Sequence, residues 1–244
     1  MRLLLILCFL VFSHLGFATS WAESTVDDPI VKGKTCNVME PLSYGGYIYQ
    51  WPSKYDQVFW PYTDAQGIWF CESSGYLSFM SDFENLSEVE IEKVKQYLSV
   101  NRLKHPSTRQ MVEMLESINA LRSFTPEYRN SLTRVYARWH QEFGDLDKSR
   151  KYRKAAYDQI QEFLKQDLSQ DKKIEYLYLA ANYSRHFDGV EKSDEYIQKF
   201  NLEVNKIDDP ELSGYVKYLS QLIKDTQYIG LGGEFEPAFP EESL

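Results

Sequence analysis

The spacing of hydrophobic and polar residues changes near residue 83 and divides the chain into two parts. Before that point the apolar residues are largely aromatic and come in short runs between turn residues, which is typical of strands. Runs at 67–71 and 76–80 predict two short strands joined by a tight turn at 73–75. After residue 83 the apolar residues recur every three or four positions, which predicts helices. We therefore expect a mainly α fold in which a small β-rich module, 35–83, precedes an α-helical domain, 84–226.

The helices of the second part carry start signals. Ser87, with Glu90 three residues later, forms a capping box that satisfies backbone N–H groups, and a second box begins at Ser107. Thr125 before Pro126 supplies a cap and a first-turn proline. Seven helices are expected, over about 87–99, 107–121, 125–143, 146–166, 172–187, 191–204 and 210–226.

The third and fourth helices repeat in the fifth and sixth at an offset of 44 residues. Ala137 aligns with Ala181 in the first helix of each pair, and Tyr152 aligns with Tyr196 in the second. A small residue, a tight turn and an inward aromatic residue are typical of tetratricopeptide (TPR) helix pairs, whose usual period is about 34 residues. The longer period fits a long fourth helix and the linker after it. We predict a TPR-like antiparallel helical array, with a non-repeating bundle and chance matches as the alternative.

The two ends of the chain differ from the rest. Arg2 is followed by an apolar run over 3–12 and by small residues at 20 and 22, which predicts a secretory signal peptide, 1–22, cleaved after Ala22. The alternative is a membrane anchor, but the run is shorter than the roughly 20 residues that span a bilayer. We expect an exported protein, periplasmic or extracellular, with no stable membrane span after cleavage. Flexible segments are predicted at the polar lead-in 23–34 and the Gly-rich, acidic tail 227–244.

Charge and cysteine content narrow the class of protein. The formal net charge is −9, which disfavours a nucleic-acid or anionic-lipid surface because such surfaces need clustered Lys and Arg. Of three cysteines, Cys8 lies in the signal, which leaves Cys36 and Cys71. In an exported chain two cysteines most simply form a disulfide. Its closed loop corresponds to about 4 kcal/mol of stabilisation in the chain-entropy treatment.

The sequence around Cys71 resembles a known family. Cys71-x-x-Ser74-Gly75-Tyr76, followed by Phe79 and a capped helix, resembles an uncharacterised bacterial family that joins a Cys-x-x-Cys zinc ribbon to TPR-like helices. The resemblance extends over most of 36–226 and implies a zinc-ribbon-like β module. The family has no assigned activity to transfer.

The chain departs from that family at the metal ligands. Met39 and Ser74 stand where the second thiolate of each Cys-x-x-Cys pair would be, and both are poor zinc ligands beside a thiolate. The resemblance implies that the two turns lie together, so that a Cys36–Cys71 bridge takes the place of zinc. No metal or other cofactor is expected.

No group of residues has the spacing of a catalytic site. Outside the signal the histidines are His105, His140 and His186, and none has a metal-ligand partner three or four residues away. Asp82 and Glu84 precede a helix, where acidic residues ordinarily act as caps. We predict no catalytic residue and a non-enzymatic protein, with an unrecognised enzyme as an alternative.

An aromatic insert, 44–62, remains as a candidate binding surface. Tyr47, Trp51, Trp60 and Tyr62 would stack on sugars or on apolar residues of a partner if they are exposed. The alternative is that they fill the core of a small module. We expect an exported protein-interaction scaffold whose partner is a protein or peptide, with an envelope carbohydrate-binding protein that uses the insert as an alternative.

Overall fold

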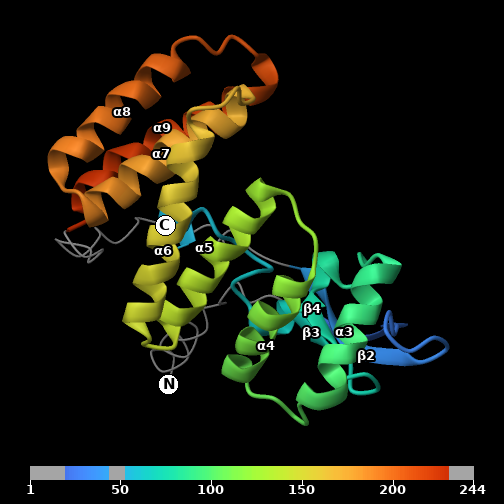
Figure 1. Cartoon of the computed structure of the whole chain (residues 1–244). Coiled ribbons are helices and arrows are strands. Elements are labelled where there is room, and N and C mark those ends of the chain that lie inside the picture. The colour runs from blue at the N-terminus through green and yellow to red at the C-terminus, as the bar shows by residue number, and fades with distance from the viewer. Residues whose placement is uncertain (1–19, 44–52, 231–244) are drawn as a thin grey trace, which may run out of the picture.

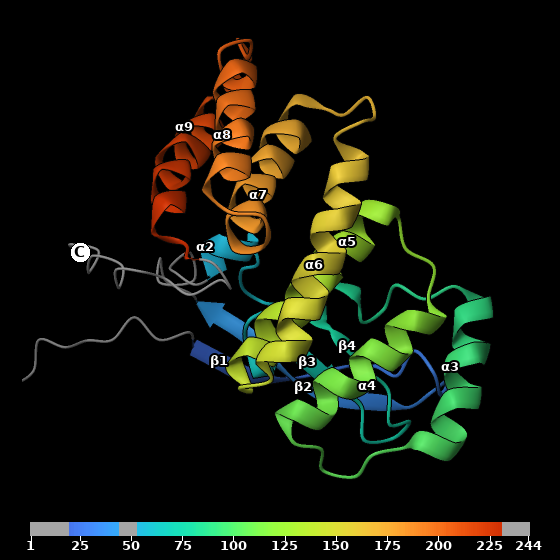
Figure 2. The same cartoon turned by 60° about the vertical axis from the view of Figure 1, so that its left-hand side comes forward.

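A computed structural model describes residues 20–43 and 53–230. Two helices, α5 (Pro126–Glu142) and α6 (Leu146–Phe163), run through the middle of the molecule. The β-rich part and the first two long helices lie at one end of this pair, and the last three long helices lie at the other (Figures 1 and 2). The predicted mainly α fold with a small β-rich N-terminal part is therefore confirmed.

Within residues 20–43 and 53–83, the β-rich part contains two small antiparallel sheets. One pairs β1 (Ser20–Asp27) with β2 (Thr35–Ser43), and the other pairs β3 (Ile68–Phe70) with β4 (Leu77–Phe79). The second sheet matches the predicted pair of strands. Its tight turn is closed by bonds from the Cys71 N–H to the Tyr76 carbonyl and from the Gly75 N–H to the Cys71 carbonyl.

The first sheet corrects the prediction of a flexible lead-in over 23–34. Residues 20–27 pair along their whole length with 35–43, and Val26 lies opposite Cys36. The half-buried positions of β1 are Trp21, Ala22, Ser24 and Val26, and this mixture of apolar and polar residues gives a hydrophobic alternation too weak to recognise from sequence. Cleavage after Ala22 would fall inside this strand.

Five further long helices complete the fold. They are α3 (Glu88–Asn101), α4 (Thr108–Leu121), α7 (Gln170–Phe187), α8 (Val190–Val204) and α9 (Ser213–Leu222). Both predicted capping boxes are present, at Ser87 and Ser107. The last predicted helix is shorter and ends in a 3-10 turn, Ile223–Tyr228. Arg185 donates to the carbonyls of Gln227 and Ile229, so the first residues of the predicted flexible tail are fixed on the helices.

The two helical hairpins α5/α6 and α7/α8 show the 44-residue repeat in their contacts. The Ser149 hydroxyl donates to the Ala137 carbonyl at 2.7 Å, and the Ser193 hydroxyl donates to the Ala181 carbonyl at 3.0 Å. Each buried serine thus ties the second helix of its hairpin to the same turn of the first. The aligned residues are equivalent in space as well as in sequence.

Two hydrophobic clusters form the core. The first joins the β-rich part to α3, α4 and α5, and the second joins α6 to α9. Tyr55, from a short unpredicted helix α2 (Ser53–Asp56), belongs to the second cluster although its neighbours in sequence belong to the first. Within the described residues, no helix has the length and apolar content needed to cross a bilayer.

Candidate functional site

Cys36 and Cys71 are disulfide-bonded, with their Cα atoms 4.8 Å apart, which confirms the predicted pairing. Both are buried. The Asp28 carboxylate lies beside them and accepts a hydrogen bond from the Ser73 hydroxyl, which is 3.1 Å from the Cys71 sulfur. Because both sulfurs are used in the bond, neither is available here as a thiolate ligand.

Met39 and Ser74, which stand in place of the second cysteine of each Cys-x-x-Cys pair, have other contacts. The Met39 carbonyl accepts a bond from Trp69 Nε1 at 2.9 Å, and the Ser74 hydroxyl accepts one from the Tyr76 N–H at 3.2 Å. A polar groove of about 970 Å³ runs beside the disulfide between the two sheets. Its lining includes Glu23, Asn37, Gln66, Trp69 and Phe70.

The four residues of the predicted aromatic binding face separate into two groups. Tyr47 and Trp51 lie outside the described residues. Trp60 is half-buried, with its ring 6.1 Å from that of Trp21. Tyr62 is half-buried too; its hydroxyl bonds to Ser81 and its carbonyl accepts from Trp139 Nε1 at 2.7 Å. Trp60 and Tyr62 therefore take part in packing, and a binding role for these four residues stays a prediction.

Among the described residues, the polar site with the most side-chain bonds holds residues 54–57, which lie within the same insert. Asp56 is fully buried, and Arg153 of α6 holds its carboxylate with two bonds of 3.0 and 2.7 Å. The Tyr183 hydroxyl of α7 donates to the same carboxylate at 2.7 Å. The Arg153 guanidinium also lies 4.7 Å from the centre of the Tyr55 ring, within cation–π range.

Side chains of the helices also hold the backbone of this segment. Four consecutive carbonyls, of residues 54 to 57, accept bonds from side chains of α5 and α7. Tyr178 donates to the first at 3.0 Å and Asn182 to the second at 3.1 Å. Arg134 Nη1 donates to the third and fourth at 2.7 and 3.2 Å. Positions 134 and 178 are equivalent in the 44-residue repeat, so both hairpins present the same position to the segment.

In this site the buried positive charge of Arg153 is paired with the buried negative charge of Asp56. Burial lowers the pKa of Arg153, but the adjacent Asp56 carboxylate outweighs that effect and raises the pKa above its usual range. Burial raises the pKa of the Tyr183 hydroxyl well above its ordinary value, so Tyr183 remains a donor. Burial, with a smaller effect from Arg153, lowers the pKa of His186 to about 4; its Nδ1 atom lies 3.0 Å from the Tyr55 hydroxyl.

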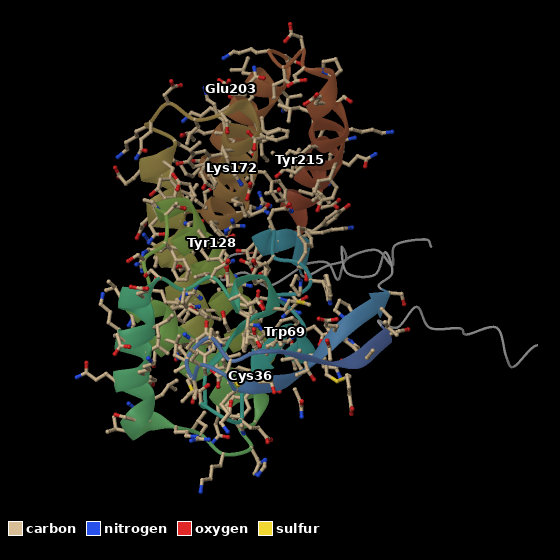
Figure 3. The ribbon with its side chains drawn as sticks, turned by 90° about the vertical axis from the view of Figure 1, so that its right-hand side faces the viewer. Cys36, Trp69, Tyr128, Lys172, Glu203 and Tyr215 are labelled. Atoms are coloured by element: carbon tan, nitrogen blue, oxygen red, sulfur yellow. A yellow bond between two sulfur atoms is a disulfide. The ribbon has the colours of Figure 1, made fainter. Side chains whose placement is uncertain are left out.

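An apolar pocket of about 550 Å³ adjoins the end of the segment. It is lined by Gln57, Phe59, Glu175, Tyr215 and Tyr218. The rings of Tyr215 and Tyr218 are stacked, with centroids 6.2 Å apart. Figure 3 shows Tyr215 at the opposite end of the molecule from Cys36 and Trp69, so this pocket is distinct from the groove at the disulfide.

The histidines lie apart from one another. His105 is exposed in the α3–α4 loop. His140 is fully buried at the end of α5, and its Nε2 atom is 2.5 Å from Glu116 Oε1. His186 lies beside residues 54–57, where it contacts the Tyr55 hydroxyl. The structure does not bring them together.

The two acidic residues before α3 are also separate from that site. Asp82 accepts a hydrogen bond from Tyr128, and burial raises its pKa, whereas Glu84 is exposed. Neither residue is part of the site around Asp56.

Comparison of the chain with family models, curated proteins and solved structures finds no match in any of the three.

Sequence reasoning missed Asp56, Arg134, Arg153 and Glu175. Each is a charged residue that is buried, and the Asp56–Arg153 pair joins residues 97 positions apart. The available signal was local. Arg134 and Arg153 interrupt the apolar faces of helices that otherwise bury Leu132, Val135 and Ile160, and a buried arginine needs a carboxylate.

Proposed function

We propose that the protein is an exported, non-enzymatic scaffold that binds a protein or peptide partner at a surface that α9 and the aromatic insert form beside a TPR-like array of α5 to α8. The proposal is supported by two repeating helical hairpins, tied by equivalent serine bonds, whose side chains hold a short peptide segment. Its β-rich part is a zinc-ribbon-like module closed by a disulfide instead of a metal. Proteins built from stacked helical pairs commonly use the surface that the pairs present together as a binding surface.

The observation that carries the proposal is the pocket beside the segment. It combines Phe59, from the aromatic insert, with Tyr215 and Tyr218 on α9. A volume of about 550 Å³ is within the usual range for a pocket that holds a ligand or an anchoring group. Three aromatic rings with an amide and a carboxylate at the side fit an apolar or aromatic side chain of a peptide, because aromatic anchors give most of the binding energy at such sites.

Selection from a random-peptide phage library tests this function without a known partner. We expect the full-length mature protein to enrich peptides with an aromatic anchor. Tyr215→Ala should reduce their binding at least about tenfold, which corresponds to about 1.4 kcal/mol. Tyr215→Phe should retain binding, and Lys217→Ala, an exposed residue of the same helix, is the matched control. Enrichment that is equal for Tyr215→Ala and the unaltered protein would contradict the proposed site.

The groove beside the disulfide supports a second candidate function, carbohydrate binding. Its lining combines Trp69 and Phe70 with amide, hydroxyl and carboxylate groups, which suits the apolar face and hydroxyl groups of a sugar. A glycan array should then return ligands whose binding is lost in Asn37→Ala and retained in Tyr215→Ala. Loss in Tyr215→Ala instead would assign the sugar to the other pocket.

A further inference from the structure

The segment 54–57 is bound to the helices in the way that a peptide ligand is bound to a receptor. Side chains of the helices donate to its consecutive backbone carbonyls, and further contacts hold its Tyr55 and Asp56 side chains. Bonds to a peptide backbone do not depend on the peptide's sequence. The pockets that hold its side chains determine which sequence binds. We call the receptor residues Arg134, Arg153, Tyr178, Asn182 and Tyr183 the segment site.

The segment is short, and the helices that hold it pair with one another through contacts of their own. Its helix, α2, is four residues long, and a single turn is not stable in water by itself. The helical hairpins are tied within themselves by Ser149 and Ser193, through bonds that do not involve the segment. The receptor is therefore formed by α5, α6 and α7, and the segment adds to it as a ligand does.

The charge of the site selects an acidic occupant. Arg153 is buried, and Asp56 supplies its carboxylate partner at 2.7 Å, while Gln141 adds a neutral contact. Without that carboxylate the guanidinium would remain buried and unpaired, which is costly. An aromatic residue before the acid completes the match, because Tyr55 packs under the Arg153 guanidinium and bonds to His186.

We propose that the segment site recognises a peptide with an aromatic–acidic pair, that the chain's own Tyr55–Asp56 occupies it in cis, and that a partner peptide of the same chemistry binds by displacing that segment. The proposal rests on the peptide-binding function above and adds to it a ligand class and a means of regulation. Arg134 connects the two sites, since it holds the carbonyls of the segment and also bonds to Glu175 of the apolar pocket at 3.2 Å. Displacement of the segment would therefore also alter the pocket.

The test is a binding measurement with a labelled, end-capped peptide Ser-Lys-Tyr-Asp-Gln-Val, identical to residues 53–58. The receptor is the full-length mature protein with Tyr55→Ala and Asp56→Ala; in this vacated variant the two side-chain positions of the site are empty, and only the backbone bonds of the tethered segment have to be displaced. We expect this variant to bind at least about tenfold more tightly than the unaltered protein, in which the tethered segment competes at high effective concentration. A peptide with Asn in place of Asp should bind at least about tenfold more weakly.

Matched variants place the binding at Arg153. Arg153→Met in the vacated protein should abolish it, whereas Lys154→Met should not, because Lys154 is exposed and pairs with Asp158 on the same helix. If the vacated variant is too unstable, Asp56→Asn is the milder alternative. A peptide that binds the native state also raises the midpoint of thermal unfolding, which can be measured in a destabilised protein.

The outcomes are distinct. No binding to the vacated variant and no rise in its melting temperature, equal binding of the Asp and Asn peptides, or binding unaffected by Arg153→Met would each overturn the inference. If that occurs while phage-selected peptides still depend on Tyr215, the inference alone fails and the proposed function stands. If the phage-selected peptides do not depend on Tyr215 but the Asp peptide binds through Arg153, the segment site stands without the apolar pocket.

Discussion

The two helical hairpins share a scaffold and differ in the residues that face the bound segment. Ser149 and Ser193 make the same bond in α5/α6 and α7/α8. At another equivalent pair, position 134 is an arginine and position 178 is a tyrosine, yet both donate to carbonyls of the segment. Small and hydroxyl residues between the helices define the repeat, whereas residues on the segment-facing side are free to specialise.

The two hairpins differ most at a position where one has a buried charged residue and the other an apolar residue. Arg153 lies on α6, and the equivalent position on α8 is Ile197, which packs against an apolar cluster. One hairpin therefore contributes a buried cation and the other an apolar residue to the same array.

Removal of the buried cation should have the largest effect. Arg153→Met keeps most of the side-chain volume but leaves the Asp56 carboxylate buried without its partner. We expect the free energy of unfolding to fall by about 3–5 kcal/mol, because a charge left unpaired in the interior is strongly destabilising. Urea unfolding at neutral pH measures this loss. Lys154→Met, next to it on the exposed face, should change stability by less than about 0.5 kcal/mol. Equal losses for the two substitutions would contradict a special role for the buried Arg153.

The disulfide should affect α5, in the first hairpin, more than the helices of the second hairpin. Cys36 and Cys71 belong to the same hydrophobic cluster as the buried residues of α5, whereas the other cluster contains residues of α6 to α9. Replacing both cysteines with alanine should lower stability by about 2–4 kcal/mol. Hydrogen exchange should show faster exchange in α4 and α5 than in α8. Equal acceleration throughout would indicate that the two clusters unfold as one unit.

His186 should make the second hairpin sensitive to acid. Its pKa is lowered from 6.5 to about 4 in the folded protein, so the unfolded state binds the proton first as the pH falls. Stability from this group is complete above pH 6.5 and decreases as the pH falls toward 4. The loss is about 2 kcal/mol by pH 5. Urea unfolding at pH 7 and pH 5 measures this loss of unfolding free energy. The loss should be absent in His186→Gln and unchanged when the exposed His105 is substituted.

The equivalent serines should have the smallest and most similar effects. Ser149→Ala and Ser193→Ala each remove one buried hydroxyl bond to a carbonyl, at 2.7 and 3.0 Å. We expect each to cost about 1 kcal/mol. Ser117→Ala, on an exposed bond within one helix, is the control and should cost less. Thermal unfolding midpoints measure the differences; effects of the two buried serines that differ severalfold would contradict their equivalence.

Most of the helices could be predicted from the sequence because their boundaries are set by local chemistry. The capping boxes at Ser87 and Ser107, the Thr125 cap and the turn glycines determine where helices begin and end. The repeat identified which helices pair. Strand β1 was missed because its half-buried residues are a mixture of apolar and polar types, and it acquires structure only by pairing with β2.

The segment site could not be predicted because its bonds join distant parts of the chain. Nothing local to Asp56 indicates a partner 97 residues away, and α2 has no hydrophobic periodicity of its own. The sequence favoured core packing of the aromatic insert over an exposed binding face, but it did not indicate that Tyr55 packs against α7. What the sequence did contain was an arginine on an apolar helix face, which indicates a buried ion pair but not the identity of the acid.

A double-mutant cycle between Asp56 and Arg153 tests most directly whether the helices hold this segment through the buried pair. Urea unfolding is measured for the unaltered protein, Asp56→Ala, Arg153→Met and the combined variant. The bonds of 3.0 and 2.7 Å between buried groups predict a coupling energy of at least about 2 kcal/mol. The combined variant should therefore lose less stability than the two single variants lose together. Additive losses, with a coupling energy within about 0.5 kcal/mol of zero, would contradict this account of the site.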